Sequence, residues 1–506
     1  MRTPSRRHVR LALAVVLVVS AGAVLSSYAR AHTTDSLGDT DEPSYGDVPI
    51  PTEDGVPQAS TAADAGSDRP ETTIDADELD DPGNVTVVAT QGFFLSDEDG
   101  ELVAFDREGE VVYYDDSYRV YFDVDPVPGT RATVEYLTSR HLEGEDCSET
   151  PQCTYNSVRR VNLSTGESRE VYGEVTPQIY STRWHDADRI NDTHVVIADI
   201  HDDSVRIVNV TSNETTWRWH ASEAYNRSQG GRGNDWTHVN DVEVLPDGRI
   251  MASVRNMDQV VFLEPGEGLQ AAWTLGEDDN YTLLYEQHNP DYIPPSRGGP
   301  AVTVADSENS RVLEYRRVDP ETGEPTTDDD GEWRRTWGWR DSRVQWPRDA
   351  DRLPDDNTLV VDTHGDRVAE VAPNGTVVWS TTVGMPYDAE RLGTGDESTG
   401  GRSMRAVRGS PDDGGGPLAA FRGDPAVTHP DRGVDATVWA VFKTITPSLV
   451  ANGLLFAGPS WLRFPDLVFG IVAVLAALSW LVLEGYWRGI SPRTAVRALH
   501  RYAAGR

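Results

Sequence analysis

The stretch NDWTHVNDVEVLPDGRIMASVRNMDQVVFL, residues 234–263, indicates the fold on which the rest of the chain is built. Its apolar residues alternate with polar ones on both sides of a Leu-Pro-Asp-Gly turn, which predicts two antiparallel strands followed by a third. His238 and Asn240 are two residues apart, so in a strand they would point to the same face. Arg255 follows the second predicted strand directly. We therefore expect a β-hairpin that carries a histidine, an asparagine and an arginine, a set able to ligate an anion.

Similar units recur along the chain. Residues 183–192 (RWHDADRIND) and 346–355 (WPRDADRLPD) share an Asp-Ala-Asp-Arg core, and 238–247 (HVNDVEVLPD) fits the same frame. Residues 287–294 (QHNPDYIP) fit it more loosely. Each is followed by an apolar strand, a polar corner and another strand, and the closing strand often ends in tryptophan. Four strands in about 50–60 residues is the size of a propeller blade, so we predict an all-β fold, a six-bladed β-propeller whose ring is closed by strands from both ends.

The repeat frame brings several polar residues into register. Four of them take equivalent inner-strand positions in four blades: His185, Asn240, His288 and Arg348. His238 lies two residues before Asn240. Arg255, at the exit of the second strand of the same blade, is expected to reach His238. His201 and His364 lie at comparable corners of other blades. Inner strands of a propeller face a central channel, so these side chains should converge on one channel mouth. For any single histidine, the plain alternative is a residue that lines a water-filled channel or bonds two blades.

A metal site is the second chemical interpretation of the same register. In that case His185, His238 and His288 would be ligands of a propeller hydrolase. Aspartates recur in every unit, including units without a histidine: Asp186, Asp241, Asp291 and Asp349. We interpret these aspartates as turn or hydrogen-bonding residues, because the inner strands provide no obvious carboxylate cluster for a hard cation. We therefore predict no metal and no cofactor.

The charge of the chain limits its environment and its partners. The 506 residues include 83 Asp and Glu against 45 Lys and Arg, a net charge of -38, and Lys443 is the only lysine. The acids are spread throughout, which favours a halophilic protein in molar salt, where the Debye length is only about 3 Å. Nucleic acid is excluded as a partner of so acidic a chain. Cys147 and Cys153 lie six residues apart, and in an exported chain this spacing predicts a local disulfide.

The two ends of the chain predict a membrane protein. Residues 1–31 join a basic start to an apolar run, as in a signal peptide or an N-terminal membrane anchor. Residues 464–487 predict a C-terminal transmembrane helix, and the positive-inside rule places the basic tail, 488–506, in the cytoplasm. Between them we expect an acidic disordered spacer, 32–82, the propeller domain, 83–393, a Gly/Pro/Asp-rich linker, 394–435, and an interfacial or re-entrant apolar segment, 436–458. The propeller should then lie on the extracellular face of the cell membrane.

Some of these motifs resemble a known family. The element Asp235-Trp-Thr-His-Val-Asn240, with Arg255 downstream, resembles the PAPS-independent aryl-sulfate sulfotransferases, which are exported six-bladed propellers. Glu286-Gln-His288 and His185-Asp186 add to the resemblance. It covers about residues 180–380 with recognisable motifs and is weaker upstream. The chain departs from the family in the Asn-Pro that follows His288 and in its C-terminal membrane helix.

The resemblance implies roles for individual residues. His288 matches the histidine that is transiently sulfated, so it is the expected nucleophile. His238 and Arg255 match residues that bind the sulfuryl oxygens, Asn240 assists, and His185 matches another active-site histidine.

Asn240, Arg348 and His364, from the same channel mouth, are expected to bind substrate. The implied reaction moves a sulfuryl group from an aryl sulfate to a phenol by a ping-pong mechanism, with no metal or nucleotide. A non-catalytic cell-surface propeller that binds a ligand or partner is the alternative function.

Overall fold

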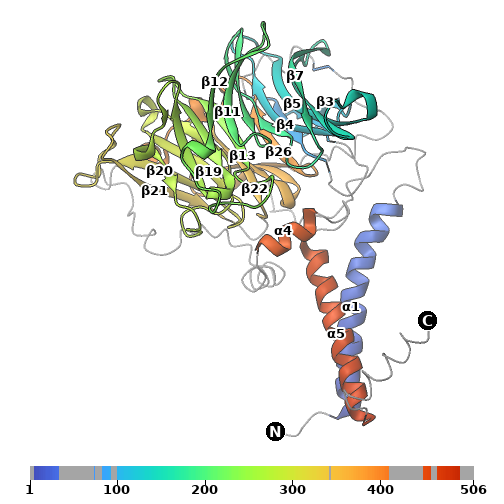
Figure 1. The fold of residues 1–506 in the computed structure, drawn as a ribbon. Helices are drawn as coiled ribbons and strands as arrows, with labels where there is room; N and C mark the ends of the chain where they lie inside the picture. The colour runs from blue at the N-terminus through green and yellow to red at the C-terminus, as the bar shows by residue number, and fades with distance from the viewer. Residues whose placement is uncertain are drawn as a thin grey trace. The chain divides into compact units, whose positions relative to one another are not determined.

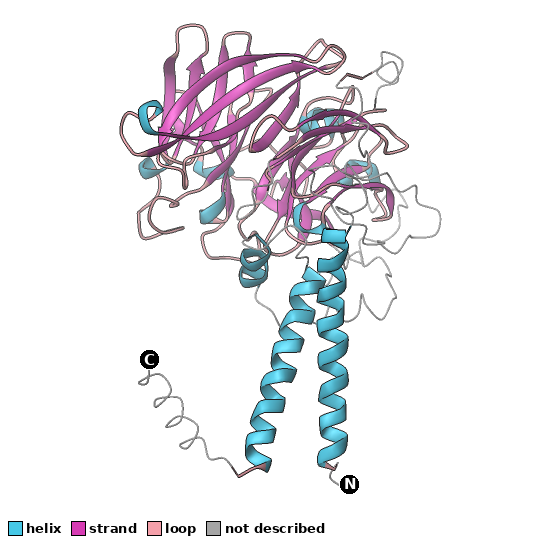
Figure 2. Cartoon of the chain, turned by 90° about the vertical axis from the view of Figure 1, so that its right-hand side faces the viewer, coloured by secondary structure: helices cyan, strands magenta, loops and turns pink. Residues whose placement is uncertain are grey.

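The computed structural model describes residues 5–33, 73–74, 83–92, 100–340, 344–408, 448–456 and 464–489, which fall into two compact units. One unit contains the two long helices, α1 (Arg6–Thr33) and α5 (Phe464–Trp487). The other contains all the described strands and two short helices, α2 (Met404–Arg408) and α4 (Ser448–Phe456). Figure 2 shows how strongly strands dominate the second unit.

Six antiparallel sheets make up the second unit, and each runs from an inner strand outward. The first is β26 (Pro386–Arg391), β1 (Thr86–Thr90), β2 (Leu102–Phe105) and β3 (Val111–Asp115). The second is β4 (Val120–Pro126), β5 (Thr133–Glu143), β6 (Gln152–Asn162) and β7 (Glu167–Pro177). The third is β8 (Trp184–Asp186), β10 (His194–Asp199), β11 (Ser204–Asn209) and β12 (Glu214–His220), with β9 (Arg189–Asn191) beside β10.

The remaining sheets follow the same plan. The fourth is β13 (Val239–Val244), β14 (Ile250–Val254), β15 (Gln259–Glu264) and β16 (Gly268–Leu269), with β17 (Leu275–Gly276) beside β15. The fifth is β18 (His288–Ile293), β19 (Ala301–Asp306), β20 (Arg311–Val318) and β21 (Glu332–Trp339). The sixth is β22 (Pro347–Arg352), β23 (Thr358–Asp362), β24 (Arg367–Val371) and β25 (Val377–Thr382). Short 3-10 turns punctuate them: η3 (Gly144–Asp146), η4 (Ala221–Glu223), η5 (Arg255–Met257), η6 (Ala271–Trp273), η7 (Pro295–Arg297), η8 (Thr363–Gly365) and η9 (Glu397–Gly400).

The inner strands follow one another around a ring, and the ring is closed by both ends of the domain. β26 pairs with β1, Thr86 lying opposite Arg391. β26 then lies between β22 and β4, which completes the circle (Figure 1). The prediction of a six-bladed β-propeller is confirmed. Because each sheet is packed on both faces by its neighbours, central strands such as β19 are buried along their whole length.

Every inner strand has a β-bulge near its start. His185, Asn240, Arg348 and Tyr387 are the extra residues at the register shifts in four of the strands. A bulge re-aims the side chains beside it, so adjacent residues no longer have to point to opposite faces. The predicted equivalence of inner-strand position therefore holds for His185, Asn240 and Arg348.

His288 is the exception to that equivalence. It pairs directly with Ala305, and the shift follows it, between His288 and Asp291. Pro290 has no N–H to donate to the ladder, which is a reason for the irregularity to fall there. The prediction that His238 and Asn240 share a strand face is also wrong, because His238 lies before β13 with a left-handed φ of 48°.

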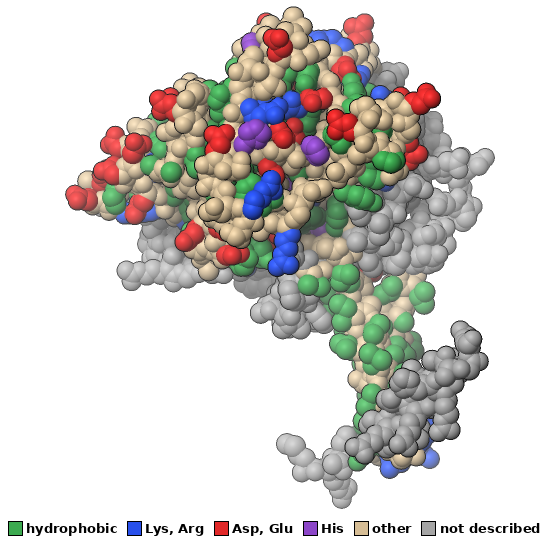
Figure 3. Space-filling view, viewed as in Figure 1, with side chains coloured by type: hydrophobic (Ala, Val, Ile, Leu, Met, Phe, Trp, Pro, Cys, Tyr) green, Lys and Arg blue, Asp and Glu red, His purple; other side chains and the backbone are tan. Residues whose placement is uncertain are grey.

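The unit of long helices is an antiparallel pair. Arg10 near the start of α1 forms a 2.7 Å ion pair with Glu484 near the end of α5, and its guanidinium lies 5.1 Å from the Trp487 ring. Two segments, Arg6–Ser26 and Asp466–Trp487, are long and apolar enough to cross a membrane, although a signal sequence near an N-terminus passes the same test. Figure 3 shows hydrophobic side chains along the surface of this pair, and acidic side chains scattered over the propeller.

The segments around the propeller differ in part from their predictions. Cys147 and Cys153 are joined by a disulfide at the end of the β5–β6 hairpin. The predicted linker, 394–435, is folded at its start, where the buried side chain of Ser398 bonds to Asp291 and the backbone N–H of Met404 bonds to Glu314. Only residues 448–456 of the predicted apolar segment are described, and they form α4. Most of the predicted spacer, 32–82, and all but the first two residues of the tail, 488–506, lie outside the described residues.

Candidate active site

A cavity of about 320 Å³ lies at the start of the inner strands. Four residues selected from the sequence line it: His185, His238, Arg255 and Arg348. The volume falls at the small end of the range for small-molecule sites, about 300–1,000 Å³. The cavity therefore has room for a compact ligand of the size of a substituted phenyl ring.

His238 is the centre of a chain of hydrogen bonds. Its Nδ1 lies 2.5 Å from Oδ1 of Asp235, and Nη1 of Arg255 donates to its Nε2 at 3.1 Å. Because arginine only donates, Nε2 accepts and Nδ1 carries the proton. Burial and then the charge of Arg255 lower the pKa of His238, against the opposite effect of Asp235. Burial alone would raise the pKa of Asp235, but His238 and Arg255 lower it, so the carboxylate stays ionised.

His288 lies just behind the cavity lining and is only 1 % exposed. Its Nδ1 is 2.8 Å from Oγ of Ser307 and 3.2 Å from the carbonyl oxygen of Glu286. The carbonyl accepts, so the proton lies on Nδ1 and Nε2 keeps its lone pair. Nε2 has no hydrogen-bond partner among the described groups. Burial, and then the charges of Arg348 and Arg255, hold the pKa of His288 well below its usual 6.5. The side chain is thus an oriented, neutral imidazole with an unpaired nitrogen.

His185 is a second neutral imidazole. Its ring stacks on Phe122 at 4.4 Å and meets His238 edge-on at 4.9 Å. Its Nδ1 donates to the carbonyl of Arg183 at 3.1 Å, which again leaves the lone pair on Nε2. Burial and then His238 lower the pKa of His185 well below 6.5.

Arg348 supplies a buried positive charge. Its guanidinium lies 4.2 Å from the Trp346 ring and 4.6 Å from the Tyr387 ring, and it donates to Gln91. Burial lowers the pKa of Arg348 to about 10, so it remains protonated at neutral pH. Its Nε has no hydrogen-bond partner among the residues that the structure describes. A buried guanidinium held by aromatic rings is suited to an anionic ligand.

Two predicted substrate-binding residues do not line the cavity. Asn240 is fully buried, and its Nδ2 donates to the carbonyl of Gln287 at 3.1 Å, so it positions the residue before His288. His364 packs against Trp346 at 4.4 Å, and burial followed by Arg348 lowers its pKa to about 3. Asn240 and His364 therefore contact residues of the site without lining the cavity.

The short helix α4 forms part of the cavity wall. Nδ2 of Asn452 donates to Oε2 of Glu308 at 3.0 Å, and its Oδ1 lies 3.4 Å from Nδ1 of His364 and also accepts from Gln345. Phe456 lies against Trp346, with ring centres 5.9 Å apart. An apolar segment that we expected at the membrane interface thus contributes a buried amide to the site.

Sequence reasoning missed several residues that surround these groups. Tyr387 is buried between His185 and His288, with ring-centre distances of 5.9 and 6.2 Å. Its signal was present, because Tyr387-Asp-Ala-Glu-Arg-Leu392 repeats the frame of residues 185–190. Asp235 stood inside a motif that we had singled out. Asn452 had no such signal, since no repeat links α4 to the blades.

The alternative of a histidine metal site is not supported by the geometry. In the part of the chain that the structure describes, the groups of side chains close enough to share a metal ion consist of carboxylates only. His185, His238 and His288 each use Nδ1 in a bond to the protein.

A family model described as Arylsulfotransferase (ASST) matches residues 81–289. The match covers the upstream blades, where we saw only weak resemblance, and ends one residue after His288. The matched residues make up less than half of the chain, so the match shows a similarity to this family over its N-terminal blades. No curated protein matches the chain.

Solved structures similar to the chain are distant. A protein of unknown function from Bacteroides caccae is 11% identical, with 61% of this chain and 98% of that one covered and a TM-score of 0.40. The periplasmic gluconolactonase of Pseudomonas aeruginosa is 12% identical, with 61% and 99% covered and a TM-score of 0.35. Likenesses at this level indicate nothing about function.

Proposed function

We propose that the protein is a PAPS-independent aryl-sulfate sulfotransferase that works by a ping-pong mechanism through sulfo-His288. The observation that carries the proposal is the state of His288, whose Nδ1 is held by Ser307 and the Glu286 carbonyl while Nε2 is unpaired. The family match, which extends as far as this histidine, supports it.

In the first half-reaction, Nε2 of His288 attacks the sulfur of the aryl sulfate. An N–S bond forms as the S–O bond to the aryl group breaks, and the aryl oxide leaves with the bonding electron pair. The imidazole then carries the sulfuryl group on Nε2 and a proton on Nδ1. The hydrogen bonds from Nδ1 stabilise the positive charge on this ring.

The sulfuryl oxygens carry negative charge throughout, and Arg255 and Arg348 are the groups that bind them. Arg255 donates one N–H to His238 at 3.1 Å, so the Asp235–His238–Arg255 chain orients the guanidinium. Burial raises the pKa of Tyr387 far above 10, so its hydroxyl keeps its proton and donates to an oxygen of the transition state. Fixed donors in a dry site are the main source of stabilisation for such a reaction.

In the second half-reaction, the oxygen of a phenol attacks the sulfur of sulfo-His288 and the N–S bond breaks. Nε2 of His288 recovers its lone pair. The phenolic proton passes to Nε2 of His185, which is neutral and unprotonated at that atom. The proton then leaves to solvent. We further propose that the two apolar helices anchor the enzyme in a membrane with the propeller on the extracellular face, where an aryl sulfate replaces a nucleotide donor.

The test is to trap the intermediate. Full-length protein in detergent is mixed with 4-nitrophenyl sulfate without acceptor, quenched in alkali and digested for mass spectrometry. We expect a burst of about one aryl oxide per chain and a sulfuryl group on His288. The burst disappears in His288→Ala and persists in His194→Ala, a histidine at the start of β10 outside the cavity.

Other outcomes would contradict the proposal. A sulfuryl group on a residue other than His288 would disprove the assigned nucleophile. Aryl oxide release without a burst and without stimulation by phenol would indicate a hydrolase. No release by folded protein from a broad set of aryl sulfates would favour a non-catalytic binding propeller.

A further inference from the structure

The inner strands carry a second set of polar residues, deeper along the propeller axis than the cavity. Buried carboxylates occur on all six: Asp123, Asp125, Asp186, Asp241, Glu243, Asp291, Asp349, Asp351, Asp388 and Glu390. Several of them bond to the next blade, as when Asp186 accepts from the N–H of Val242 at 2.8 Å and Glu243 accepts from Tyr292 at 2.7 Å. For Asp186 our hydrogen-bonding interpretation agrees with the structure.

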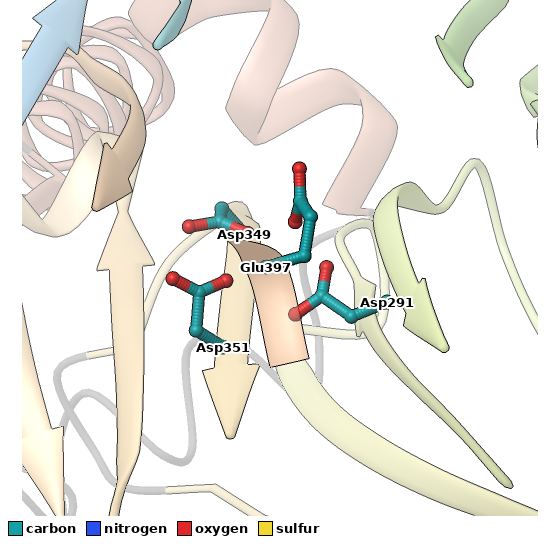
Figure 4. A group of neighbouring side chains, drawn as sticks. All are labelled: Asp291, Asp349, Asp351 and Glu397. Atoms are coloured by element: carbon teal, nitrogen blue, oxygen red, sulfur yellow. The ribbon is translucent and has the colours of Figure 1, made fainter. Parts of the chain in front are cut away.

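Four carboxylates form a group that this interpretation does not explain. Asp291 comes from β18, Asp349 and Asp351 from β22, and Glu397 from η9 (Figure 4). Each offers one oxygen, and the four oxygens lie within 4.8 Å of one another. None of the four residues lines the cavity that holds the histidines.

Three of these side chains keep an oxygen without a partner. Asp291, Asp349 and Asp351 are 1 %, 0 % and 2 % exposed. Oδ1 of Asp291 and Oδ2 of both other residues receive no hydrogen bond from the described protein groups. A buried carboxylate oxygen without a donor is costly, and three of them occur within this one small group. The side chains of Asp351 and Glu397 also lie within hydrogen-bond reach of Asp291, so these carboxyl groups must either share protons or hold a cation.

Arg352 is a basic residue whose charge interacts with that of Asp291 in this group. The guanidinium of Arg352, which follows Asp351 in β22, forms a 3.1 Å ion pair with Glu314. Across the described ranges, no arginine or histidine forms an ion pair with any of the four carboxylates. Salt in solution screens exposed charges well but buried ones poorly, so bulk ions do not remove the repulsion.

The backbone is constrained in a way that brings Glu397 to the axis. Glu397 has a left-handed φ of 48°, uncommon for a residue with a side chain, and its N–H bonds to Oε1 of Glu390 at 2.8 Å. The neighbouring Ser398 donates to Asp291 and accepts from the N–H of Arg352. These hydrogen bonds hold η9, which lies outside the blades, so that the carboxyl group of Glu397 joins Asp291, Asp349 and Asp351.

We propose that Asp291, Asp349, Asp351 and Glu397 bind a divalent, oxygen-preferring cation on the propeller axis, with Ca²⁺ the best fit. Ca²⁺ takes oxygen ligands at about 2.3–2.6 Å, so oxygens on opposite sides of the ion are up to about 5 Å apart. The limit of 4.8 Å accommodates such an ion, and Ca²⁺ accepts irregular sets of carboxylates whereas Mg²⁺ demands near-ideal octahedral geometry. The ion joins two neighbouring blades to η9 and neutralises charge that no ion pair among the described residues offsets. This proposal departs from our prediction that the chain has no metal site.

The test uses full-length protein in detergent and molar KCl, stripped with EGTA and then titrated with Ca²⁺. We expect about one tightly bound Ca²⁺ per chain by elemental analysis, and a higher Tm with Ca²⁺ than with EGTA. Asp351→Asn should weaken Ca²⁺ binding by more than about tenfold. In EGTA the same variant should melt no lower than the wild type, because it removes one of the repelling charges.

Two controls keep the test specific. Asp355→Asn, at the exposed turn after β22, should bind Ca²⁺ as the wild type does. Asp278→Asn should do the same, although Asp258, Asp278 and Asp279 form a second, more exposed acidic group. Loss of the ion in Asp278→Asn instead of Asp351→Asn would overturn the proposal, as would wild-type protein that holds no Ca²⁺ and melts identically in EGTA. These two wild-type measurements decide the question even where a variant does not fold.

Discussion

The two ends of the propeller axis are built on the same six strands and have opposite chemistry. Arg348 and Asp349 are neighbours in β22, yet one is a cation beside aromatic rings and imidazoles, and the other is buried among acids. The bulge at Arg348 allows both side chains to face the axis instead of opposite faces of the sheet. Register irregularities, rather than strand order, thus separate the proposed anion site from the proposed cation site.

The comparison also shows two ways of keeping a buried polar group without a partner. At the cavity, Nε2 of His288 is unpaired but neutral, because burial and two arginines oppose its protonation. On the axis, the unpaired oxygens belong to carboxyl groups whose pKa values are raised by burial and by one another, so their charged form needs a cation to offset it. The proposed catalysis therefore falls in the first region and the proposed ion binding in the second.

Removal of the His288 side chain should have the largest effect on turnover and should leave the carboxylate group on the axis unchanged. His288→Ala removes the nucleophile, and we expect phenol-dependent turnover to fall by at least about 10⁴-fold. Ca²⁺ binding, measured by calorimetry on the same sample, should not change. If turnover falls less than about tenfold, another residue is the nucleophile.

A matched pair of neighbours in β22 is the next test. Arg348→Gln removes a cation that binds the sulfuryl oxygens, and kcat should fall by about 10²–10³-fold, the usual effect of losing one such donor. Asp349→Asn should instead lower Ca²⁺ affinity, with a smaller effect on kcat. If both variants lower both quantities equally, the two regions form one functional unit.

The pH dependence of stability tests the neutral imidazoles. Burial lowers the pKa of His364 from 6.5 to about 3, so the unfolded chain binds a proton that the folded one excludes. This stabilisation is present above pH 6.5 and is lost as the pH falls. In urea unfolding from pH 7 to 4, the advantage of the wild type over His364→Gln should shrink by about 1.4 kcal/mol per pH unit below 6.5. A constant difference would show that His364 titrates normally.

The smallest effect is expected at the cavity wall. Asn452→Ala removes the hydrogen bonds from α4 to Glu308, His364 and Gln345. We expect KM to rise by about three- to tenfold with kcat less affected, since each lost hydrogen bond is worth about 0.5–1.5 kcal/mol. Leu454→Ala, an exposed position on the same helix, is the control. Identical kinetics in both variants would mean that α4 does not contribute to the site.

The sequence predicted the blades well, because their signal is local. Strand alternation and the Asp-Ala-Asp-Arg repeat depend on residues close together in the chain, and the structure confirms six blades. The same repeat predicted equivalent positions for His185 and Arg348, and both lie at the bulge of their inner strand. The predicted strand position of His238 was wrong, because His238 precedes β13 with a left-handed backbone. The predicted register of His288 was also wrong, because the bulge in β18 follows it. A single left-handed residue and the place of a single bulge do not recur along the chain, so a periodic sequence pattern does not reveal them.

By itself, therefore, the sequence determined the all-β propeller, the two apolar helices and the histidine–arginine set, because hydrophobic periodicity and residue type are properties of neighbouring residues. Only the tertiary structure decided which of these side chains meet. Ring closure brings Tyr387 beside His185, α4 brings Asn452 to Glu308, and η9 brings Glu397 to Asp291. The convergence of unpaired carboxylates on the axis arises only when strands far apart in the chain are packed around one centre, where burial turns ordinary aspartates into a candidate cation site.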